Sequence, residues 1–191
     1  MGDHAAESGT RARTRRAILA AAARVLAKDR AATLAHIAKA ADVGRSTLHR
    51  YFADRDELIG EAVAEAYLVI QRAVEDAAIG DGAPLDAMRR LVEGLVQTGD
   101  LLLFLHGDSR VLDGVDVDER APNPVTQGVH DLIARGQREG VFDPEAGVEW
   151  VHDVLWALVY SGCDAASRGV LPRHGVAAAV VRVFEDGVRK R

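Results

Sequence analysis

Apolar side chains recur along nearly the whole chain at the spacing of three to four residues that one face of an α-helix requires. In the first such stretch, Ile18, Leu19, Ala22, Val25 and Leu26 form one stripe. No stretch shows the alternation of apolar and polar residues that is typical of a half-buried β-strand. Aromatic residues make up only 5% of the chain, and alanine-rich helices pack closely without them. The sequence therefore predicts an all-α fold of about nine helices.

The first third of the chain predicts a helix-turn-helix over residues 33–52. A helix is expected over residues 14–28, and the Thr33 hydroxyl is a suitable N-cap for a second helix. A break follows at residues 42–44, and a third short helix begins directly after it. Two short helices separated by a tight turn are the arrangement that places a helix in the major groove of DNA.

The third helix has the two faces that such a role requires. Leu48 and Phe52 are four residues apart and point inward, which leaves a polar and basic outer surface. The outward residues are Arg45, Ser46, Thr47, His49 and Arg50. Arginine can bond O6 and N7 of guanine together, and serine or threonine hydroxyls suit phosphates and several base edges.

The charge distribution supports this interpretation, although the net charge of −5 does not. Between Arg11 and Gly60 there are eleven Lys or Arg and five Asp or Glu, a local balance of +6 that leaves −11 for the rest. A basic head on an acidic body directs one end of the molecule toward phosphates.

The rest of the chain is also expected to be helical. Asp54 and Glu57 form a capping box that starts a fourth helix. The remaining helices are expected over residues 55–78, 84–98, 100–106, 125–139, 144–167 and from 171 to the C-terminus. Pro144 is expected at the first position of the eighth helix, and a polar loop precedes the seventh.

Residues 14–63, about a third of the chain, resemble the DNA-binding head of the tetracycline-repressor (TetR) family. The matching segments are TRRAIL, LAHIAKAADV and GRSTLHRYFADRDEL. The resemblance implies an N-terminal three-helix helix-turn-helix domain, joined by a long helix to a C-terminal helical domain that binds a ligand and dimerises. It implies a repressor that binds a pseudo-palindromic DNA operator as a homodimer and is released by a small-molecule effector.

The resemblance and the outward face together assign contacts with DNA. The predicted DNA-binding residues are Arg13, Thr33, Arg45, Ser46, Thr47, His49, Arg50, Tyr51 and Arg55. Three positions depart from the family pattern: Asp42 replaces a glycine, Gly44 a serine and His49 the common tyrosine. Aspartate tolerates a left-handed turn at modest cost, so the turn is expected to persist.

The division into domains follows from the same resemblance. Residues 1–12 are predicted to be a disordered basic arm, residues 13–60 the DNA-binding domain and residues 61–191 the ligand-binding and dimerisation domain. The dimer interface is expected at Trp150, Val154, Ala157, Leu158, Ser161, Ala165, Val176, Ala179, Val180, Val183 and Phe184. The ligand pocket is expected at Met88, Leu91, Leu95, Phe104, His106, His130, Trp156 and Tyr160. Both sets can instead be ordinary core of one subunit.

Other classes of protein find little support in the sequence. It contains no P-loop, GxSxG, HExxH or dinucleotide-binding fingerprint, so no catalytic residue, enzyme activity or cofactor is predicted. His152 and Asp153 are adjacent on a helix, which argues against a dyad. His106, His130 and His152 lack the spacing of a helical metal site, and no metal is expected.

The N-terminus and the apolar runs of the sequence also predict where the protein resides. The N-terminus lacks the apolar segment of a secretory signal, and no apolar run reaches the ~20 residues that span a bilayer. A cytoplasmic protein with no membrane contact is therefore expected. An enzyme and a DNA-binding protein without any ligand are the two alternatives to a ligand-responsive repressor.

Overall fold

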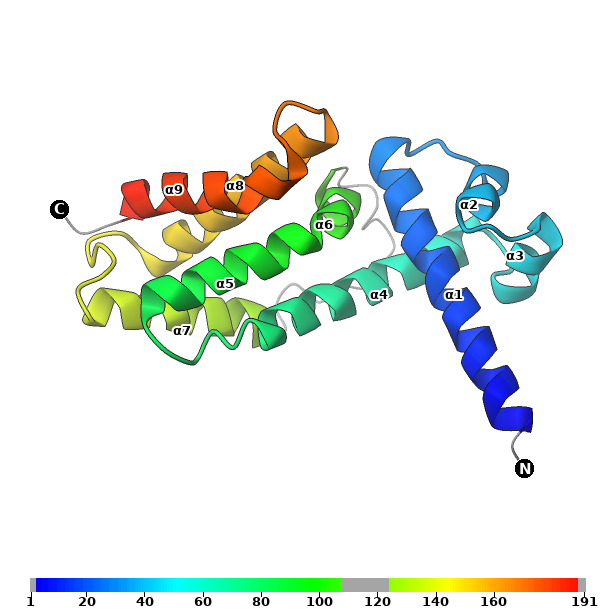
Figure 1. Ribbon diagram of the computed structural model, residues 1–191, viewed down its shortest axis with the longest axis horizontal. Helices are drawn as coiled ribbons and strands as arrows, with labels where there is room; N and C mark the ends of the chain where they lie inside the picture. Colours follow the sequence, from blue (N-terminus) through cyan, green and yellow to red (C-terminus); the bar gives the residue numbers. More distant parts are fainter. Residues whose placement is uncertain (1–2, 108–123, 189–191) are drawn as a thin grey trace. The chain divides into compact units, whose positions relative to one another are not determined.

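The computed structural model describes residues 3–107 and 124–188, which form nine α-helices and one short 3₁₀ turn but no β-strand (Figure 1). The helices are α1 (Asp3–Lys28), α2 (Leu34–Ala40), α3 (Arg45–Tyr51), α4 (Arg55–Asp76), α5 (Pro84–Gln97), α6 (Gly99–His106), α7 (Pro124–Arg138), α8 (Val148–Ser167) and α9 (Val176–Val188). The prediction of an all-α chain is confirmed. Most of the predicted polar loop lies outside the described residues.

Helix α1 is longer than the sequence pattern predicts. In place of a disordered arm over residues 1–12, α1 begins at Asp3 and continues to Lys28 without a break. Alanine and glutamate at positions 5–7 favour a helix, and no proline interrupts this segment. Arg11 and Arg13 therefore stand on a helix.

Helix α8 begins at Val148, so the prediction that Pro144 opens it is wrong. The side-chain amide of Gln137 donates hydrogen bonds to the carbonyl oxygens of Asp143 and Ala146, at 2.9 and 2.6 Å. These bonds hold the segment before α8 in a turn against α7. The last helix likewise starts later than expected, because the 3₁₀ turn η2 (Arg173–Gly175) precedes α9.

The contacts divide the chain into two compact units, here called the head unit and the body unit. The head unit contains the chain up to Leu68 and returns at Asp100 to include most of α6. The body unit contains residues 69–99 and the described chain from Pro124 onward. In contrast to the predicted boundary at residue 60, α6 packs with the head although it follows α5 in sequence.

Two arginines fasten the parts of the head unit to one another. Arg55, the first residue of α4, donates hydrogen bonds to the carbonyl oxygens of Arg30 and Ala32, at 2.6 and 2.5 Å. Arg30 donates to the carbonyl oxygen of Leu103 in α6 at 3.1 Å, and its guanidinium lies 5.7 Å from the centre of the Phe104 ring. Helix α6 is thereby tied to the link between α1 and α2.

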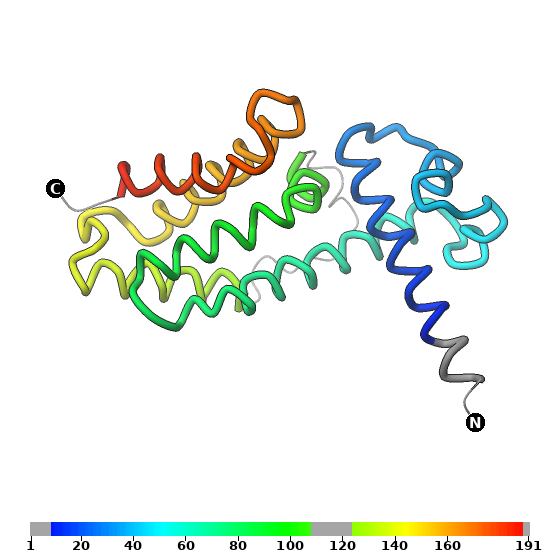
Figure 2. The backbone as a smooth tube through the Cα atoms, viewed as in Figure 1, coloured from blue at the N-terminus to red at the C-terminus, as the bar shows by residue number. Residues whose placement is uncertain are grey.

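Helices α5, α7, α8 and α9 pack against one another in the body unit (Figure 2). Their contacts are close: a Cβ added at Gly162 of α8 would lie 2.9 Å from the side chains of Val176 and Val180. The buried side chains of this core include Met88, Leu91, Leu95, Val129, Leu132, Ile133, Leu155, Val159, Val180 and Phe184.

Candidate nucleic-acid interface and body pocket

Helix α2 begins as its N-cap predicts. Thr33 has an extended backbone, and its hydroxyl oxygen accepts a hydrogen bond from the His36 amide at 3.4 Å. The Thr33 side chain is exposed, and the hydroxyl proton can still be donated to another acceptor. A threonine in this position caps the helix and offers a donor to a phosphate at the same time.

The turn between α2 and α3 depends on a left-handed residue. Asp42 has a φ of 54°, and the amide of Val43 donates to the Ala38 carbonyl oxygen at 3.0 Å to close the turn. The prediction that aspartate would take over the turning role of glycine is confirmed. Gly44 follows as the N-cap of α3 and makes no side-chain cap, as its lack of a side chain requires.

We expect Asp42→Val to lower the free energy of unfolding by about 1–2 kcal/mol, since a β-branched residue is strained at positive φ. Asp42→Gly is the matched control and should retain the stability of the parent chain, because glycine adopts this conformation freely. Urea denaturation of both variants measures the difference. Equal stabilities of the valine and glycine variants would contradict a structural need for the left-handed turn.

Helix α3 presents the two faces that its sequence predicts. Leu48 is buried, and Phe52, which follows the helix, is fully buried. Arg45, Ser46, His49 and Arg50 are exposed, Thr47 is half-buried. The predicted base-reading residues therefore share the outer surface of one short helix that is anchored from beneath by two apolar side chains.

The start of α4 carries the predicted capping box. The Asp54 carboxylate accepts from the Glu57 amide at 2.9 Å, and the Glu57 carboxylate accepts from the Ala53 amide. Arg55 is predicted to meet phosphate, and its guanidinium also makes contacts within the chain. It is half-buried, and the two carbonyl contacts described above engage its guanidinium, so its position indicates a structural role.

Two arginines of α1 approach aromatic rings at the end of the helix-turn-helix. Arg15 forms an ion pair with Glu61 of α4, and its guanidinium lies 5.2 Å from the centre of the Phe52 ring. Arg11 instead approaches the Tyr51 ring, at 5.8 Å from its centre. The sequence gives no signal for this contact, because the two residues lie on different helices and forty positions apart.

The residues predicted to line a ligand pocket are divided between the two units. Met88, Leu91 and Leu95 are at most 2% exposed and belong to the core of the body unit. Phe104 is fully buried in the head unit, and His106 at the end of α6 is exposed. The three remaining residues, His130, Trp156 and Tyr160, are half-buried on α7 and α8.

His130 and Trp156 both contact His152, which is not among the residues predicted to line the pocket. The indole nitrogen of Trp156 donates a hydrogen bond to Nε2 of His152 at 2.8 Å, and the His130 ring lies edge-on to His152 with 4.8 Å between ring centres. Nδ1 of His152 lies 3.3 Å from the Asp153 carboxylate, so these neighbours do meet, contrary to expectation. Since Nε2 accepts from the indole, the proton of neutral His152 sits on Nδ1.

The environment of His152 favours its neutral form. Burial lowers the pKa of His152 below the ordinary 6.5, and the nearby His130 acts in the same direction. The hydrogen bond and charge of Asp153 oppose this shift without overcoming it. Protonation at Nε2 would also set two donors against each other, because the Trp156 indole can only donate.

The stability of the protein should fall as pH drops below about 6.5, because a depressed pKa in the folded state leaves the unfolded state to bind the proton first. His152→Gln should make the stability less dependent on pH between 6.5 and the lower pKa of the folded state. Exposed His174 provides the matched control His174→Gln. Chemical denaturation across this pH range measures the slopes, and an unchanged slope in His152→Gln would contradict the assignment.

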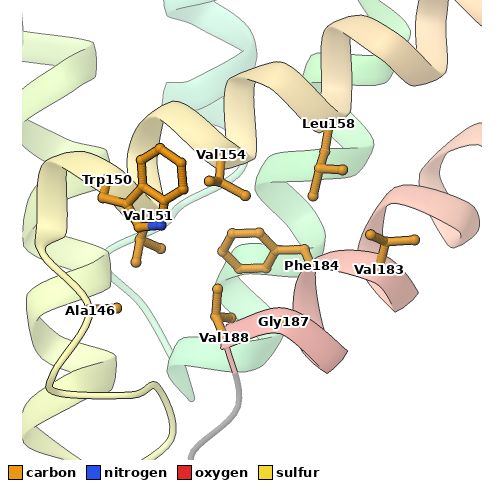
Figure 3. A pocket seen from close by; sticks show the side chains of 9 residues that line it. All are labelled: Ala146, Trp150, Val151, Val154, Leu158, Val183, Phe184, Gly187 and Val188. Atoms are coloured by element: carbon orange, nitrogen blue, oxygen red, sulfur yellow. The ribbon is translucent and has the colours of Figure 1, made fainter.

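A pocket of about 230 Å³ lies between α8 and α9 in the body unit (Figure 3). It is lined by Ala146, Trp150, Val151, Val154, Leu158, Val183, Phe184, Gly187 and Val188. Five of these residues belong to the predicted dimer interface, and none belongs to the predicted ligand pocket. Figure 3 shows the side chains of the two helices facing each other across the opening.

The residues predicted to form the dimer interface differ in how far they are buried within their own subunit. Val176, Val180 and Phe184 are buried in their own body unit, so for them the alternative of an ordinary core holds. Trp150 and Val183 are 66% and 54% exposed, unusual values for large apolar side chains. The other predicted residues, Val154, Ala157, Leu158, Ser161, Ala165 and Ala179, are exposed or half-buried.

Other kinds of site find no support in the described part of the chain. No three His, Cys, Asp or Glu side chains of residues 9–107 and 124–188 are grouped so that they could hold a metal ion. Within the same ranges, none of the helices combines the length and apolar character needed to cross a membrane.

Comparison with known proteins gives a consistent result. Residues 18–62 match the family described as bacterial regulatory proteins, tetR family. The chain is 35% identical over 182 residues to the HTH-type transcriptional repressor LfrR of Mycolicibacterium smegmatis, covering 95% of this chain and 94% of LfrR. It is 28% identical over 174 residues to the HTH-type transcriptional regulator NfxB of Pseudomonas aeruginosa, covering 90% and 92%.

Solved structures show the same similarity in three dimensions. The TetR-like regulator LfrR from Mycobacterium smegmatis superposes with a TM-score of 0.73 at 32% identity, over 95% of this chain and 99% of LfrR. The structure of LfrR in complex with proflavine gives a TM-score of 0.69 at 31% identity, over 94% and 99%.

Proposed function

The chain belongs to the TetR family and is a DNA-binding transcriptional regulator, not an enzyme, and from this premise we propose that it represses transcription as a homodimer on a pseudo-palindromic operator. The exposed polar face of α3 is the observation that carries the proposal. In this function the head unit binds DNA, and the body unit dimerises and responds to a small molecule in the cytoplasm.

Recognition of bases rests on the outer face of α3. Arg45 and Arg50 are exposed and can each bond guanine O6 and N7 in the major groove. Ser46, Thr47 and His49 add shorter polar contacts to bases or phosphates. Thr33 and Arg13 contribute from α2 and α1, and Tyr51 from the end of α3. These side chains read DNA because Leu48 and Phe52 fix the helix beneath them.

The exposed and half-buried residues of the predicted interface on α8 and α9 form the proposed dimer interface. Trp150 and Val183 expose apolar surface beside a pocket that a side chain of a second copy can fill. A two-fold pair of such faces buries the same residues on both subunits. The two α3 helices of a dimer would then enter successive major grooves about 34–36 Å apart.

Release from DNA by a small molecule is the proposed mode of control. The relative LfrR has been solved in complex with proflavine, and this chain matches LfrR over nearly its whole length. We place the effector in the body unit, near the half-buried polar and aromatic group of His130, His152, Trp156 and Tyr160. An effector releases DNA if it binds the conformation that does not fit the operator better than the one that does.

Selection of bound DNA from a random library tests the central proposal. A pseudo-palindrome whose half-sites are centred about one helical turn apart should be enriched at moderate salt. Enrichment of no sequence would refute operator binding.

A thermal-shift screen with planar and apolar small molecules then separates a ligand-responsive repressor from a constitutive one, because only the former is stabilised by its effector.

A further inference from the structure

One arginine of α1 contacts the two segments that adjoin the end of α3. The guanidinium carbon of Arg15 lies over the Phe52 ring, 5.2 Å from its centre, and the same guanidinium forms an ion pair with Glu61 of α4. All three residues belong to the head unit. A carboxylate and an aromatic ring face both attract a cation, so the Arg15 side chain holds α4 and the residue after α3 at once.

Phe52 determines where α3 ends and how the helix is seated. The backbone leaves the helix at this residue, with φ −137° and ψ 123°, and its amide donates to the Leu48 carbonyl oxygen at 3.0 Å. The ring itself is fully buried. Since α3 has only about two helical turns, a small displacement of this ring tilts the whole outer face that carries Arg45 and Arg50.

A second contact connects the same part of α4 to the end of α3. The Glu57 carboxylate, one turn before Glu61, accepts from the Ala53 amide. This bond fixes the backbone after α3, whereas the Arg15 contact acts on the Phe52 side chain. Loss of the Arg15 contact therefore leaves the helix-turn-helix folded and removes one constraint on the orientation of α3.

The charge of Arg15 is already balanced within the protein. Glu61 supplies the anion, and the Arg15 and Glu61 side chains are 40% and 31% exposed. A guanidinium paired with a carboxylate has less to gain from a phosphate than an exposed one such as that of Arg50. We propose that Arg15 and Glu61 are positioning residues, which seat α3 for base reading through Phe52 and bind no DNA themselves. The inference rests on the proposed function, because that function gives the outer face of α3 the task of reading bases.

The double substitution Arg15→Met with Glu61→Gln tests this role, since it removes the ion pair and leaves the net charge unchanged. Methionine retains an apolar stem beside the ring. The affinity for the selected operator should fall about fivefold to tenfold, which is comparable to the loss of one base contact. The slope of log K against log salt should keep its wild-type value, because no phosphate contact is lost. Fluorescence anisotropy measures both quantities.

Binding to random duplex DNA separates positioning from a loss of stability. Non-specific binding depends on phosphate contacts, so a shifted α3 should leave it within about twofold of wild type. A merely destabilised head has fewer folded molecules and loses affinity for both DNAs by the same factor. Such a parallel loss would overturn the proposal, and so would an unchanged operator affinity or a salt slope reduced by ~0.9.

Arg24→Met with Glu65→Gln is the matched control. It makes the same chemical changes on α1 and α4, and within the described residues neither Arg24 nor Glu65 forms an ion pair. This variant should bind both DNAs as the wild type does. An operator loss equal to that of the Arg15 and Glu61 double variant would contradict the proposal.

Amide hydrogen exchange tests the support of α3 without DNA. The amides of α3 and of Phe52 should exchange faster in the Arg15 and Glu61 double variant, and those of α8 and α9 should not change. Unchanged exchange in α3 would show that Arg15 does not seat this helix. Failure of the wild-type chain to select any DNA would refute the proposed function instead.

Discussion

Val183→Glu should convert the protein to a monomer and reduce its operator affinity by about 10²–10⁴-fold, the gain that a second linked binding module provides. Val183 is 54% exposed at the edge of the pocket between α8 and α9, so the isolated subunit tolerates glutamate there. In a dimer the carboxylate would be buried without a partner, which is strongly unfavourable. Analytical ultracentrifugation and operator titration measure the two effects.

Val170→Glu is the control for this experiment. Val170 is another exposed valine, at 66%, and it lies in the loop after α8 and outside the proposed interface. The control should remain a dimer and bind the operator with unchanged affinity. A dimer that survives Val183→Glu, or dissociates equally in Val170→Glu, would place the interface elsewhere.

Phe52→Ala should destabilise the head unit by about 3–5 kcal/mol, the usual cost of removing a large buried aromatic side chain. The Phe52 ring is fully buried and also carries the Arg15 guanidinium on one face. Its loss would release α3 from its support, so operator binding should disappear, while the body unit retains its own core.

Amide hydrogen exchange locates the effect of Phe52→Ala, with faster exchange expected in α2 and α3 and little change in α8 and α9. Phe52→Leu retains most of the volume and should cost less than about 1.5 kcal/mol, with operator binding preserved. Equal exchange in wild type and Phe52→Ala would show that Phe52 does not anchor the recognition helix.

The local features of the head could be predicted from the sequence because each depends on a few neighbouring residues. The Thr33 cap, the left-handed turn at Asp42 and the inward Leu48 and Phe52 all follow from spacing and side-chain chemistry, and the structure confirms them. The capping box at Asp54 belongs to the same group.

The features that could not be predicted depend on contacts between different elements of the chain. Arg55 has the position of a phosphate ligand in the sequence, yet its guanidinium bonds two carbonyl groups more than twenty residues earlier. Pro144 matches the pattern of a first helical residue, yet the Gln137 side chain of the preceding helix donates hydrogen bonds to the backbone carbonyl oxygens of Asp143 and Ala146. No local pattern indicates either contact, nor the contact of His152 with His130, which lies on a different helix.

The hydrogen bond between Arg30 and α6 has a consequence for chimeras in which the DNA-binding head of one regulator is joined to the body of another. A head excised as one continuous N-terminal fragment would lack Phe104 and the Leu103 carbonyl, both of which Arg30 engages. Such a fragment would lose the hydrogen bond from Arg30 to the Leu103 carbonyl oxygen, at the link that also holds Arg55. A chimera with the body of another regulator should therefore carry residues 100–106 along with the first 68, because two separate segments of the chain build the head unit.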